Sequence, residues 1–273
     1  MPESDQELLA AARAGDDAAL DALLERHQAR IYRFGMKLCR DPEDAKDVLQ
    51  DTLVAMARSV RDVEGRSSLS TWLYAVARSL CIKKRRRSKF APEREASMQT
   101  EAAAQVARLP DTGPQPDEVA ASREVAAALE AAIRQLPADQ REVLVLRDIE
   151  GLKATEVGQV LELSVAAVKS RLHRARLQVR ETVASELASA PLPPPNPGCP
   201  DVLLMYSKHL EGEISGALCA EMEAHIEQCP RCRGACDSLK ETLSVCRSTP
   251  ARAVPQAIQE SVRAALRAFL RSA

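Results

Sequence analysis

The sequence predicts an all-α protein, and its composition and hydrophobic spacing are the two observations behind that prediction. Of the 273 residues 45% are hydrophobic, but only 3% are aromatic. A chain that is poor in large rings and rich in Ala, Leu, Arg and Glu has the composition of compact helix bundles. Apolar residues also recur every three or four positions over long stretches. Because the length exceeds that of a usual single domain, we expect several small helical domains.

The first domain is expected at residues 1–90, as a set of helices with clear start signals. Ser4 and Glu7 form an S-x-x-E capping box, and Asp41 followed by Pro42 is a strong N-cap and first-turn pair. Between and after these signals, apolar residues at helical spacing predict the core. They are Leu20, Leu23, Leu24, Ile31, Phe34, Leu38, Ala45, Val48, Leu49, Thr52, Leu53, Met56, Ala57, Val60, Leu73, Val76, Ala77 and Leu80.

Two segments that lack helical periodicity divide the rest of the chain. Residues 91–118 mix Ala, Glu, Pro and Gly and predict a flexible linker, whereas the Pro-rich residues 189–198 predict a stiffer one. They delimit a second helical domain at 119–188 and a third unit at 199–273. The N-terminus has no basic segment followed by an apolar stretch, and no run approaches the roughly 18 apolar residues of a membrane span. We therefore expect a cytoplasmic protein.

The second domain contains the pattern of a helix-turn-helix. Val157, Val160 and Leu161 share one helix face, a turn follows at Glu162, and Ser164 is the N-cap of the next helix. Val165, Val168 and Leu172 are expected to face inward. A set of polar and cationic residues is left for the outer faces, where a helix can enter the major groove. It consists of Lys169, Ser170, Arg171, His173, Arg174 and Arg176. The alternative is a basic, solvated helix without a DNA-binding role.

The third unit has the ligand spacing of a metal site. His225-x3-Cys229-x2-Cys232 brings three ligands together, and Cys199 is the best fourth ligand for tetrahedral zinc, with His209 and Cys219 as alternatives. In a domain this small, zinc would supply much of the stability. Six of the eight cysteines follow residue 198, which in a reducing compartment favours metal or redox chemistry over structural disulfides. The alternative for this unit is a set of reduced, buried cysteines. Three more thiols stay unassigned, either for sensing or as spare core residues: Cys219, Cys236 and Cys246.

The segment LPADQREVLVLRDIEGLKATEVGQVLELSVAAVKSRLHRAR resembles the −35-reading domain of extracytoplasmic-function (ECF) sigma factors. The resemblance implies that Lys169, Ser170 and Arg174 meet base edges or adjacent phosphates, with Arg171, His173 and Arg176 in support. The sequence differs from the family pattern in a cap, a turn and a phosphate-contacting position. These positions hold Lys153, Glu162 and Ala167.

RIYRFGMKLCRDPEDAKDVLQDTLVAMARSV followed by STWLYAVARSLCIKKRRR resembles the sigma domain that grips core RNA polymerase and opens the −10 region. A polar face of its second helix would then dock on the β′ clamp helices, while the −35 domain would meet the β flap. That face consists of Asp44, Asp47, Gln50 and Asp51, and by charge alone it could equally be a solvated face. The loop Gly65 to Ser70 and a basic helix are expected at single-stranded DNA. The DNA contacts from that helix would be Arg78, Lys84, Arg85 and Arg86. Trp72 is expected at the edge of the core rather than as a stacking platform.

The stretch from Cys199 to Cys232 resembles the zinc-binding anti-sigma domain that usually forms a separate protein. The resemblance implies control in cis, with inhibition and activation both open. The last helix, with Ile258 and Val262 on its apolar face, could pack on the zinc unit or on the sigma domains. A rival hypothesis is a stand-alone helix-turn-helix regulator. No nucleophile elbow, H-E-x-x-H motif or Gly-rich phosphate loop is present, so we do not expect an enzyme.

Overall fold

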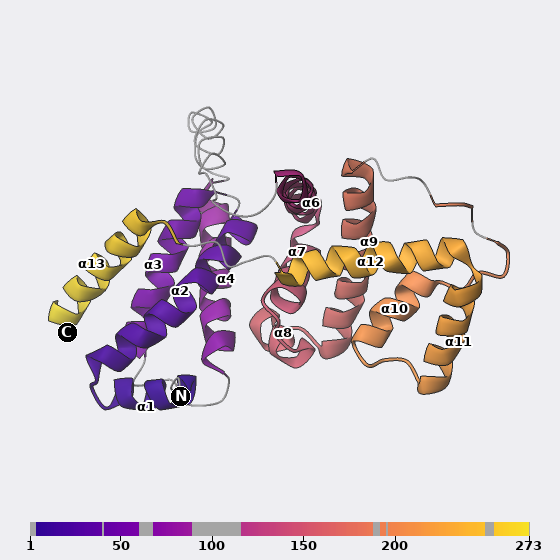
Figure 1. Ribbon diagram of the computed structural model, residues 1–273. Coiled ribbons are helices and arrows are strands. Elements are labelled where there is room, and N and C mark those ends of the chain that lie inside the picture. The colour runs from indigo at the N-terminus through magenta and orange to yellow at the C-terminus, as the bar shows by residue number, and fades with distance from the viewer. Residues whose placement is uncertain are drawn as a thin grey trace. The chain divides into compact units, whose positions relative to one another are not determined.

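The computed structural model describes residues 4–39, 41–59, 68–88, 116–187, 192–194, 196–248 and 254–272, and all regular structure in these ranges is helical (Figure 1). The all-α prediction is confirmed. The chain divides into two compact units, which we describe separately: residues 1–113, 159–161 and 251–273, and residues 114–158 and 162–250. Within the described ranges, no helix is both long enough and apolar enough to cross a bilayer.

The first unit is a bundle around α2. Its helices are α1 (Asp5–Arg13), α2 (Asp17–Cys39), α3 (Pro42–Ser59), α4 (Leu69–Ser88) and α13 (Gln256–Ser272). Helix α2 packs against α1, α3 and α4, and α3 and α4 also contact each other. The predicted core residues of α2 and α3 are buried, and only Val60 lies outside the described residues.

The helix ends in this unit follow the predicted caps. The Ser4 side chain accepts from the Glu7 N–H, and the Glu7 carboxylate accepts from the Ser4 N–H. Asp41 accepts from the backbone N–H of Glu43 at 2.7 Å and of Asp44 at 3.2 Å. Between α1 and α2 the chain turns at Gly15, whose φ of +97° lies in the left-handed region that favours glycine.

Helix α4 buries a different set of side chains from the predicted one. Leu73 and Ala77 are buried as expected, but Val76 and Leu80 are only half-buried. The core instead receives Tyr74, whose ring lies 5.1 Å from that of Phe34, and Cys81. Trp72 is half-buried, which agrees with a place at the edge of the core.

A disulfide joins Cys81 in α4 to Cys39 at the end of α2, with 5.3 Å between their Cα atoms. The sequence analysis missed this pair, because the two cysteines are 42 residues apart and belong to no spacing motif. The cross-link connects two helices that already pack against each other. It therefore cross-links two neighbouring helices of the bundle.

The C-terminal helix α13 belongs to the first unit, where it packs against α3 (Figure 1). Val262 is buried, and the Arg263 guanidinium pairs with the Glu25 carboxylate of α2. The sequence left two placements open for this helix, on the zinc unit or on the sigma domains. In the structure it packs on the predicted polymerase-binding domain.

The second unit joins the helix-turn-helix to the cysteine-rich segment. Its helices are α6 (Pro116–Gln135), α7 (Ala138–Leu144), the π-helical turn η2 (Val145–Ile149), α8 (Ala154–Leu161, of which 159–161 group with the first unit), α9 (Val165–Glu186), α10 (Val202–Leu210), α11 (Gly216–Gln228) and α12 (Pro230–Ser248). Helices α6 and α7, which precede α9 in the sequence, pack on it, and so do α10 and α12, which follow it (Figure 1). The long helix α9 is thus shared by both halves of the unit.

Several predicted segments lie outside the described residues. They are residues 62–67 of the loop before α4, residues 91–115 of the first linker and residues 189–191 and 195 of the second. Helix α6 begins at Pro116, slightly before the predicted linker end. Where the Pro-rich segment is described, the Pro193 carbonyl accepts a 2.6 Å hydrogen bond from Arg231 of α12.

Candidate nucleic-acid interface and metal centre

The turn between α8 and α9 has the backbone geometry of a tight helix-turn-helix. Glu162 adopts φ 58° and ψ 44°, a left-handed conformation that glycine or asparagine takes more easily. Gly158 permits the close turn, because a Cβ there would lie 2.8 Å from the Leu163 carbonyl oxygen. Ser164 caps α9 by accepting from the Ala167 N–H at 3.2 Å. The predicted turn and cap are therefore present.

The inward face of α9 is largely as predicted. Val168 and Leu172 are fully buried, but Val165 is 37% exposed, which corrects the prediction that it faces inward. Val165 is the first residue of α9, directly after the Ser164 cap, and the buried residues of this helix begin at Val168. Among the polar residues, Ser170 and Arg174 are exposed, and half-buried Arg171 lies 3.6 Å from the Asp139 carboxylate.

Arg176 does not lie on an outer face, and this prediction is wrong. Its side chain is fully buried and makes two hydrogen bonds to the Asp148 carboxylate, at 2.6 and 2.8 Å. It also reaches Glu211 at 2.8 Å and the Ser207 carbonyl at 3.2 Å. Helical spacing placed Arg176 outside because it takes no account of partners such as Asp148 and Glu211, which lie 28 and 35 residues away. Burial opposes the charge of the guanidinium, but the hydrogen bonds and charges of Asp148 and Glu211 outweigh it and raise the pKa of Arg176.

His173 is also buried rather than outward-facing, and it contacts the same C-terminal segment. Its Nδ1 lies 2.7 Å from the Ser207 hydroxyl and its Nε2 lies 3.0 Å from the Glu213 carboxylate. Lys169 lies 3.3 Å from the Glu213 carboxylate and donates to the Glu211 carbonyl at 3.2 Å. Desolvation opposes ionisation of Glu213, but the bonds from His173 and Lys169 prevail and lower its pKa.

The two glutamates that hold α9 lie on the turn between α10 and α11. Gly212 stands between them with φ +66°, so the chain reverses sharply and both side chains can face α9. The Glu211 side chain is only 2% exposed and also accepts from Arg147 at 3.1 Å. The sequence analysis did not select either glutamate. The sequence feature that could have indicated them is the E-G-E triplet in an otherwise weakly charged turn. Only the fold shows that this triplet faces α9.

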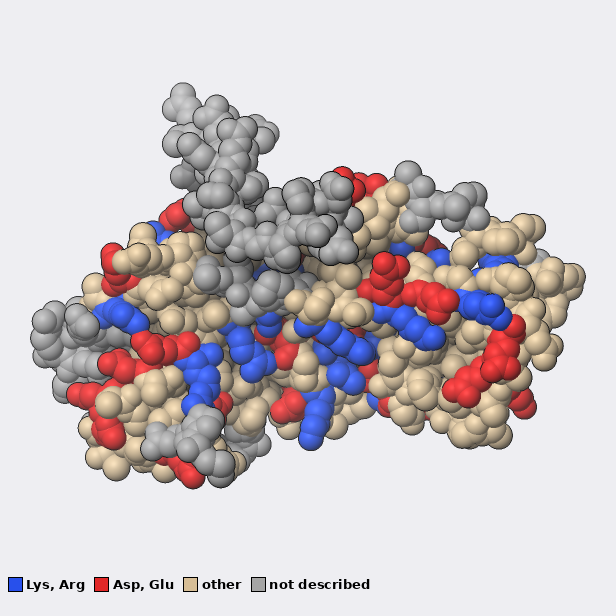
Figure 2. All heavy atoms as spheres, in the orientation of Figure 1, with Lys and Arg blue, Asp and Glu red and all other residues tan. Residues whose placement is uncertain are grey.

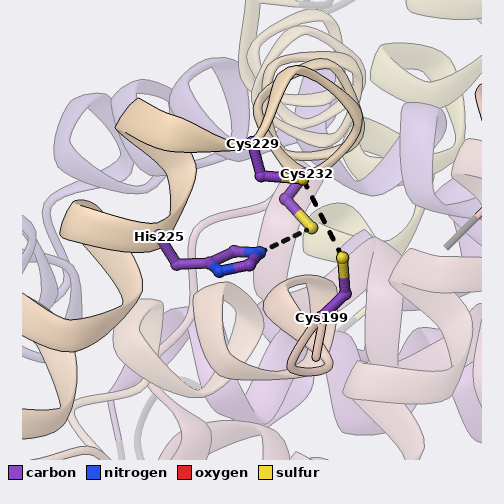
Figure 3. A group of neighbouring side chains, drawn as sticks. All are labelled: Cys199, His225, Cys229 and Cys232. Atoms are coloured by element: carbon purple, nitrogen blue, oxygen red, sulfur yellow. Dashed lines mark hydrogen bonds between the residues drawn. The ribbon is translucent and has the colours of Figure 1, made fainter. Parts of the chain in front are cut away.

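The predicted metal ligands converge on one point in the C-terminal half of this unit. The ligand atoms of Cys199, His225, Cys229 and Cys232 all lie within 4.8 Å of one another (Figure 3). Cys199 precedes α10, His225 is in the last turn of α11, Cys229 is its C-cap, and Cys232 is in the first turn of α12. The Sγ atoms of Cys199 and Cys229 are 3.8 Å apart, and His225 Nε2 is 3.2 Å from Cys232 Sγ.

These separations suit a tetrahedral zinc ion, whose thiolate and imidazole ligands stand about 3.5–3.8 Å from one another. Burial, followed by the neighbouring thiols, raises the pKa of Cys232 to about 12, whereas a backbone hydrogen bond from the Cys232 N–H lowers the pKa of Cys229. Without a cation, the site therefore disfavours ionisation of all its thiols together. A bound zinc ion would remove that penalty by binding three thiolates and the neutral imidazole.

The other C-terminal thiols lie outside this cluster. His209 and Cys219, which the sequence left as alternative ligands, contact each other at 3.4 Å, so Cys199 is the fourth member. Cys236 and Cys246 are buried and belong to no disulfide among the described residues. Burial raises the pKa of Cys236, which packs beside Val202 and Cys232.

In the first unit, the predicted polymerase-binding face of α3 is in contact with the predicted DNA-binding helix α4. Lys84 pairs with Asp47 and lies 3.6 Å from Asp44. Partial burial raises the pKa of Asp44 although Lys84 opposes the shift. The remaining predicted residues differ in exposure. Asp51 and Arg86 are exposed, whereas Gln50, Arg78 and Arg85 are half-buried.

Comparison with known families assigns these parts. The Sigma-70 region 2 model matches residues 23–90, the Sigma-70 region 4 model matches 126–179, and a zinc-finger family model matches 199–233. The ECF RNA polymerase sigma factor SigM of Mycobacterium tuberculosis is 33% identical over 176 residues, which are 64% of this chain and 83% of that protein. The chain belongs to the ECF sigma factors.

Two further relatives and one solved structure are also similar to this chain. SigE of Mycolicibacterium smegmatis is 32% identical over 62% of this chain, and the chain spans 65% of the length of SigE. RNA polymerase sigma-H factor of Pseudomonas aeruginosa is 28% identical over 69% of this chain and 98% of its own length. The structure of CnrH in complex with the cytosolic domain of CnrY superposes with a TM-score of 0.48 at 25% identity, over 67% of this chain and 99% of that one.

In this sigma factor, region 4 and the zinc-finger segment are parts of one compact unit, in which α9 of region 4 contacts α10 and α12 of the C-terminal segment. On the face drawn in Figure 2, basic and acidic side chains are interspersed, and no large surface of basic residues alone is visible there.

Proposed function

We propose that this sigma factor directs core RNA polymerase to promoters and that its C-terminal zinc module inhibits it in cis. The observation that carries the proposal is the set of bonds from the recognition helix to the module: Lys169, His173 and Arg176 all bind Glu211 or Glu213. Lys169, whose side chain is the least buried of the three, cannot give the same N–H groups to a glutamate and to a DNA phosphate. The turn between α10 and α11 therefore competes with DNA for α9.

The competition is electrostatic and local. A carboxylate accepts the same charge-assisted hydrogen bonds from Lys and Arg as a phosphate oxygen does. Because Glu211 and Glu213 are attached to the same compact unit as α9, they act at a high effective concentration. DNA binding then requires the module to leave α9. The measured affinity is the intrinsic affinity multiplied by the fraction of molecules in which the module has left.

Zinc would fix the inhibitory arrangement. The ligand cluster connects the start of α10 to the junction of α11 and α12, and so it holds the ends of both helices that flank the glutamate turn. The nearby core is small, with Val202, Cys229, Cys232 and Cys236 at its centre. Such a core needs the additional stability that structural zinc supplies.

The other roles follow the family assignment. Residues 1–90 would bind core polymerase through the α3 face and the melted −10 strand through α4, and residues 119–188 would read the −35 duplex with Lys169, Ser170 and Arg174. The segments 91–118 and 189–198 would be linkers, and residues 199–273 the regulatory part. The protein would act in the cytoplasm on DNA and polymerase without an enzymatic activity of its own. A stand-alone helix-turn-helix regulator does not account for the region 2 match.

The deciding experiment is run-off transcription with core RNA polymerase and promoter DNA selected by the truncated protein 1–189. We expect both proteins to support promoter-specific transcripts, with higher output from 1–189 than from the full chain. If neither protein yields a transcript, the proposed activity in promoter-specific transcription is refuted. If the full chain is the more active one, the module activates and the proposed sign is wrong.

Point variants test the contact itself. In the full chain, the double substitution Glu211→Gln, Glu213→Gln should raise affinity for the −35 duplex toward that of 1–189. Glu221→Gln is the matched control, because Glu221 is an exposed carboxylate on α11 without an ion pair to α9 among those the structure shows. Equal affinities of the double variant, the control and the unmodified chain would show that the glutamates do not compete with DNA.

A further inference from the structure

A second group of metal-binding side chains lies next to the glutamate turn, apart from the four-ligand cluster. His209 Nδ1 and Cys219 Sγ are 3.4 Å apart, and Cys219 Sγ lies 3.6 Å from the Glu223 carboxylate. His209 is near the end of α10, whereas Cys219 and Glu223 stand one turn apart on α11. Packing in a hydrophobic core does not explain why these three side chains lie together, since His209 and Glu223 are exposed and Cys219 is half-buried.

The spacing of the first pair is that of two ligands on one ion. Bonds of about 2.3 Å to sulfur and about 2.0–2.1 Å to nitrogen at a tetrahedral angle separate the two ligand atoms by about 3.6 Å. The imidazole ring is held for this contact, because it stacks on Tyr206 with 6.3 Å between ring centroids and 26° between planes. Glu223 follows Cys219 by four residues and reaches the same ion by a side-chain rotation.

The pair closes the turn that carries the inhibitory glutamates. His209 comes two residues before Glu211, and its carbonyl accepts the Gly212 N–H at 3.0 Å. Cys219 lies six residues after Glu213, on the helix that leaves the turn. An ion bound by both side chains would tie the two ends of the turn together while Glu211 and Glu213 face α9.

We propose that His209, Cys219 and Glu223 form a regulatory site for a divalent transition-metal ion of borderline softness, such as Zn²⁺ or Co²⁺, and that the ion acts as a co-repressor. The mixed nitrogen, sulfur and oxygen donors suit this class of ion, and water completes the coordination. On binding, the thiol proton of Cys219 leaves to solvent and the thiolate bonds to the ion. The co-repressor role rests on the proposed cis inhibition, whereas the site itself does not.

The sign of the effect follows from linkage. The two ligand atoms are already spaced for the ion in the arrangement in which the module holds α9. An ion that prefers this arrangement stabilises it, and DNA must weaken ion binding by the same factor by which the ion weakens DNA binding. Coupling of ordinary strength would lower the affinity for the −35 duplex by about 5–150-fold.

Metal content tests the site independently of DNA. The full chain, loaded with zinc at the four-ligand cluster, is titrated with Co²⁺ and followed by equilibrium dialysis and by the absorption of thiolate-bound cobalt. We expect one further ion per chain, lost in Cys219→Ser and in His209→Ala and bound at least tenfold more weakly in Glu223→Gln. Glu221→Gln, on the same helix, should bind as the unmodified chain does. Absence of the further ion, or its retention in Cys219→Ser, would overturn the site.

DNA binding tests the co-repressor role. Co²⁺ should weaken binding of the −35 duplex by the full chain and leave Cys219→Ser and His209→Ala unaffected. Cobalt binding without any change in DNA affinity would refute the regulatory role, as would stronger DNA binding. If the full chain with Glu211→Gln and Glu213→Gln binds DNA no better than the unmodified chain, cis inhibition fails, and the dialysis result still decides whether the metal site exists.

Discussion

At the scale of single residues, Arg176 shows how two buried carboxylates can pair with a basic residue that helical spacing alone assigns to the surface. Asp148 belongs to the region 4 part of the unit and Glu211 to the zinc module, so the guanidinium connects the two parts. Both carboxylate side chains are almost completely buried, at 1% and 2% exposure. Burial makes each charge depend on its partner, since no water replaces a lost hydrogen bond.

Arg176→Ala should therefore destabilise the second unit by about 3–5 kcal/mol, the usual effect of leaving buried charges without their partner. Hydrogen exchange along α9, followed by mass spectrometry on the full chain, measures the change. Arg174→Ala is the control, because Arg174 is exposed and bonds only to Ser170 on its own helix. That substitution should alter stability by no more than about 0.5 kcal/mol. Equal loss of protection in both variants would contradict the structural role of Arg176.

Residues whose role depends on local spacing could be predicted from the sequence. The Ser4 and Asp41 caps follow from neighbouring positions, and the metal ligands His225, Cys229 and Cys232 follow from a short motif. Residues whose role depends on distant partners could not. His173 was expected on an outer face, but Ser207 and Glu213, which bury it, lie 34 and 40 positions further along the chain.

At the scale of elements, the Cys39–Cys81 disulfide joins α2 to α4 inside the domain that the Sigma-70 region 2 model matches. Composition favoured metal or redox chemistry for the cysteines because most of them cluster near the C-terminus. That argument holds for the cluster and does not extend to these two. Helical periodicity does show that Leu38 and Ala77 face the core, but it cannot pair one helix with another.

Reduction of this disulfide should lower the stability of the first unit by about 4 kcal/mol, because a cross-link that closes a loop of this length removes that much chain entropy from the unfolded state. Trp72 lies in α4, so its fluorescence reports urea unfolding of this unit with and without reductant. Cys81→Ser should abolish the effect of the reductant, whereas Cys219→Ser, outside this unit, should preserve it. Identical unfolding midpoints of the unmodified chain under both conditions would contradict a stabilising cross-link.

At the scale of the whole molecule, the C-terminal region contacts both sigma domains, each within its own unit. Helices α10 and α12 pack on α9, and α13 packs on α3. The all-α class, the helix-turn-helix and the metal cluster could be anticipated, because each depends on composition or on a motif. The apolar face of α13 fits any complementary helix, and so its sequence alone left two partners open.

Salt dependence of DNA binding distinguishes cis competition from a passive module. In the truncated protein 1–189, Lys169 has lost its partner Glu213 and can bind a phosphate. Arg176 retains its ion pair with Asp148 and is not expected to bind a phosphate. In the full chain, DNA binding also releases Glu211 and Glu213, which then take up cations and offset counterion release. A plot of log affinity against log salt should therefore be steeper for 1–189, by an amount comparable with the slope of about 0.9 that one phosphate contact contributes. Fluorescence anisotropy on a −35 duplex over a salt series gives both slopes. Full-length Glu221→Gln should keep the shallower slope, and Glu211→Gln, Glu213→Gln should approach the steeper one. Parallel lines for the truncated and full proteins would mean that the module does not exchange ion pairs with DNA.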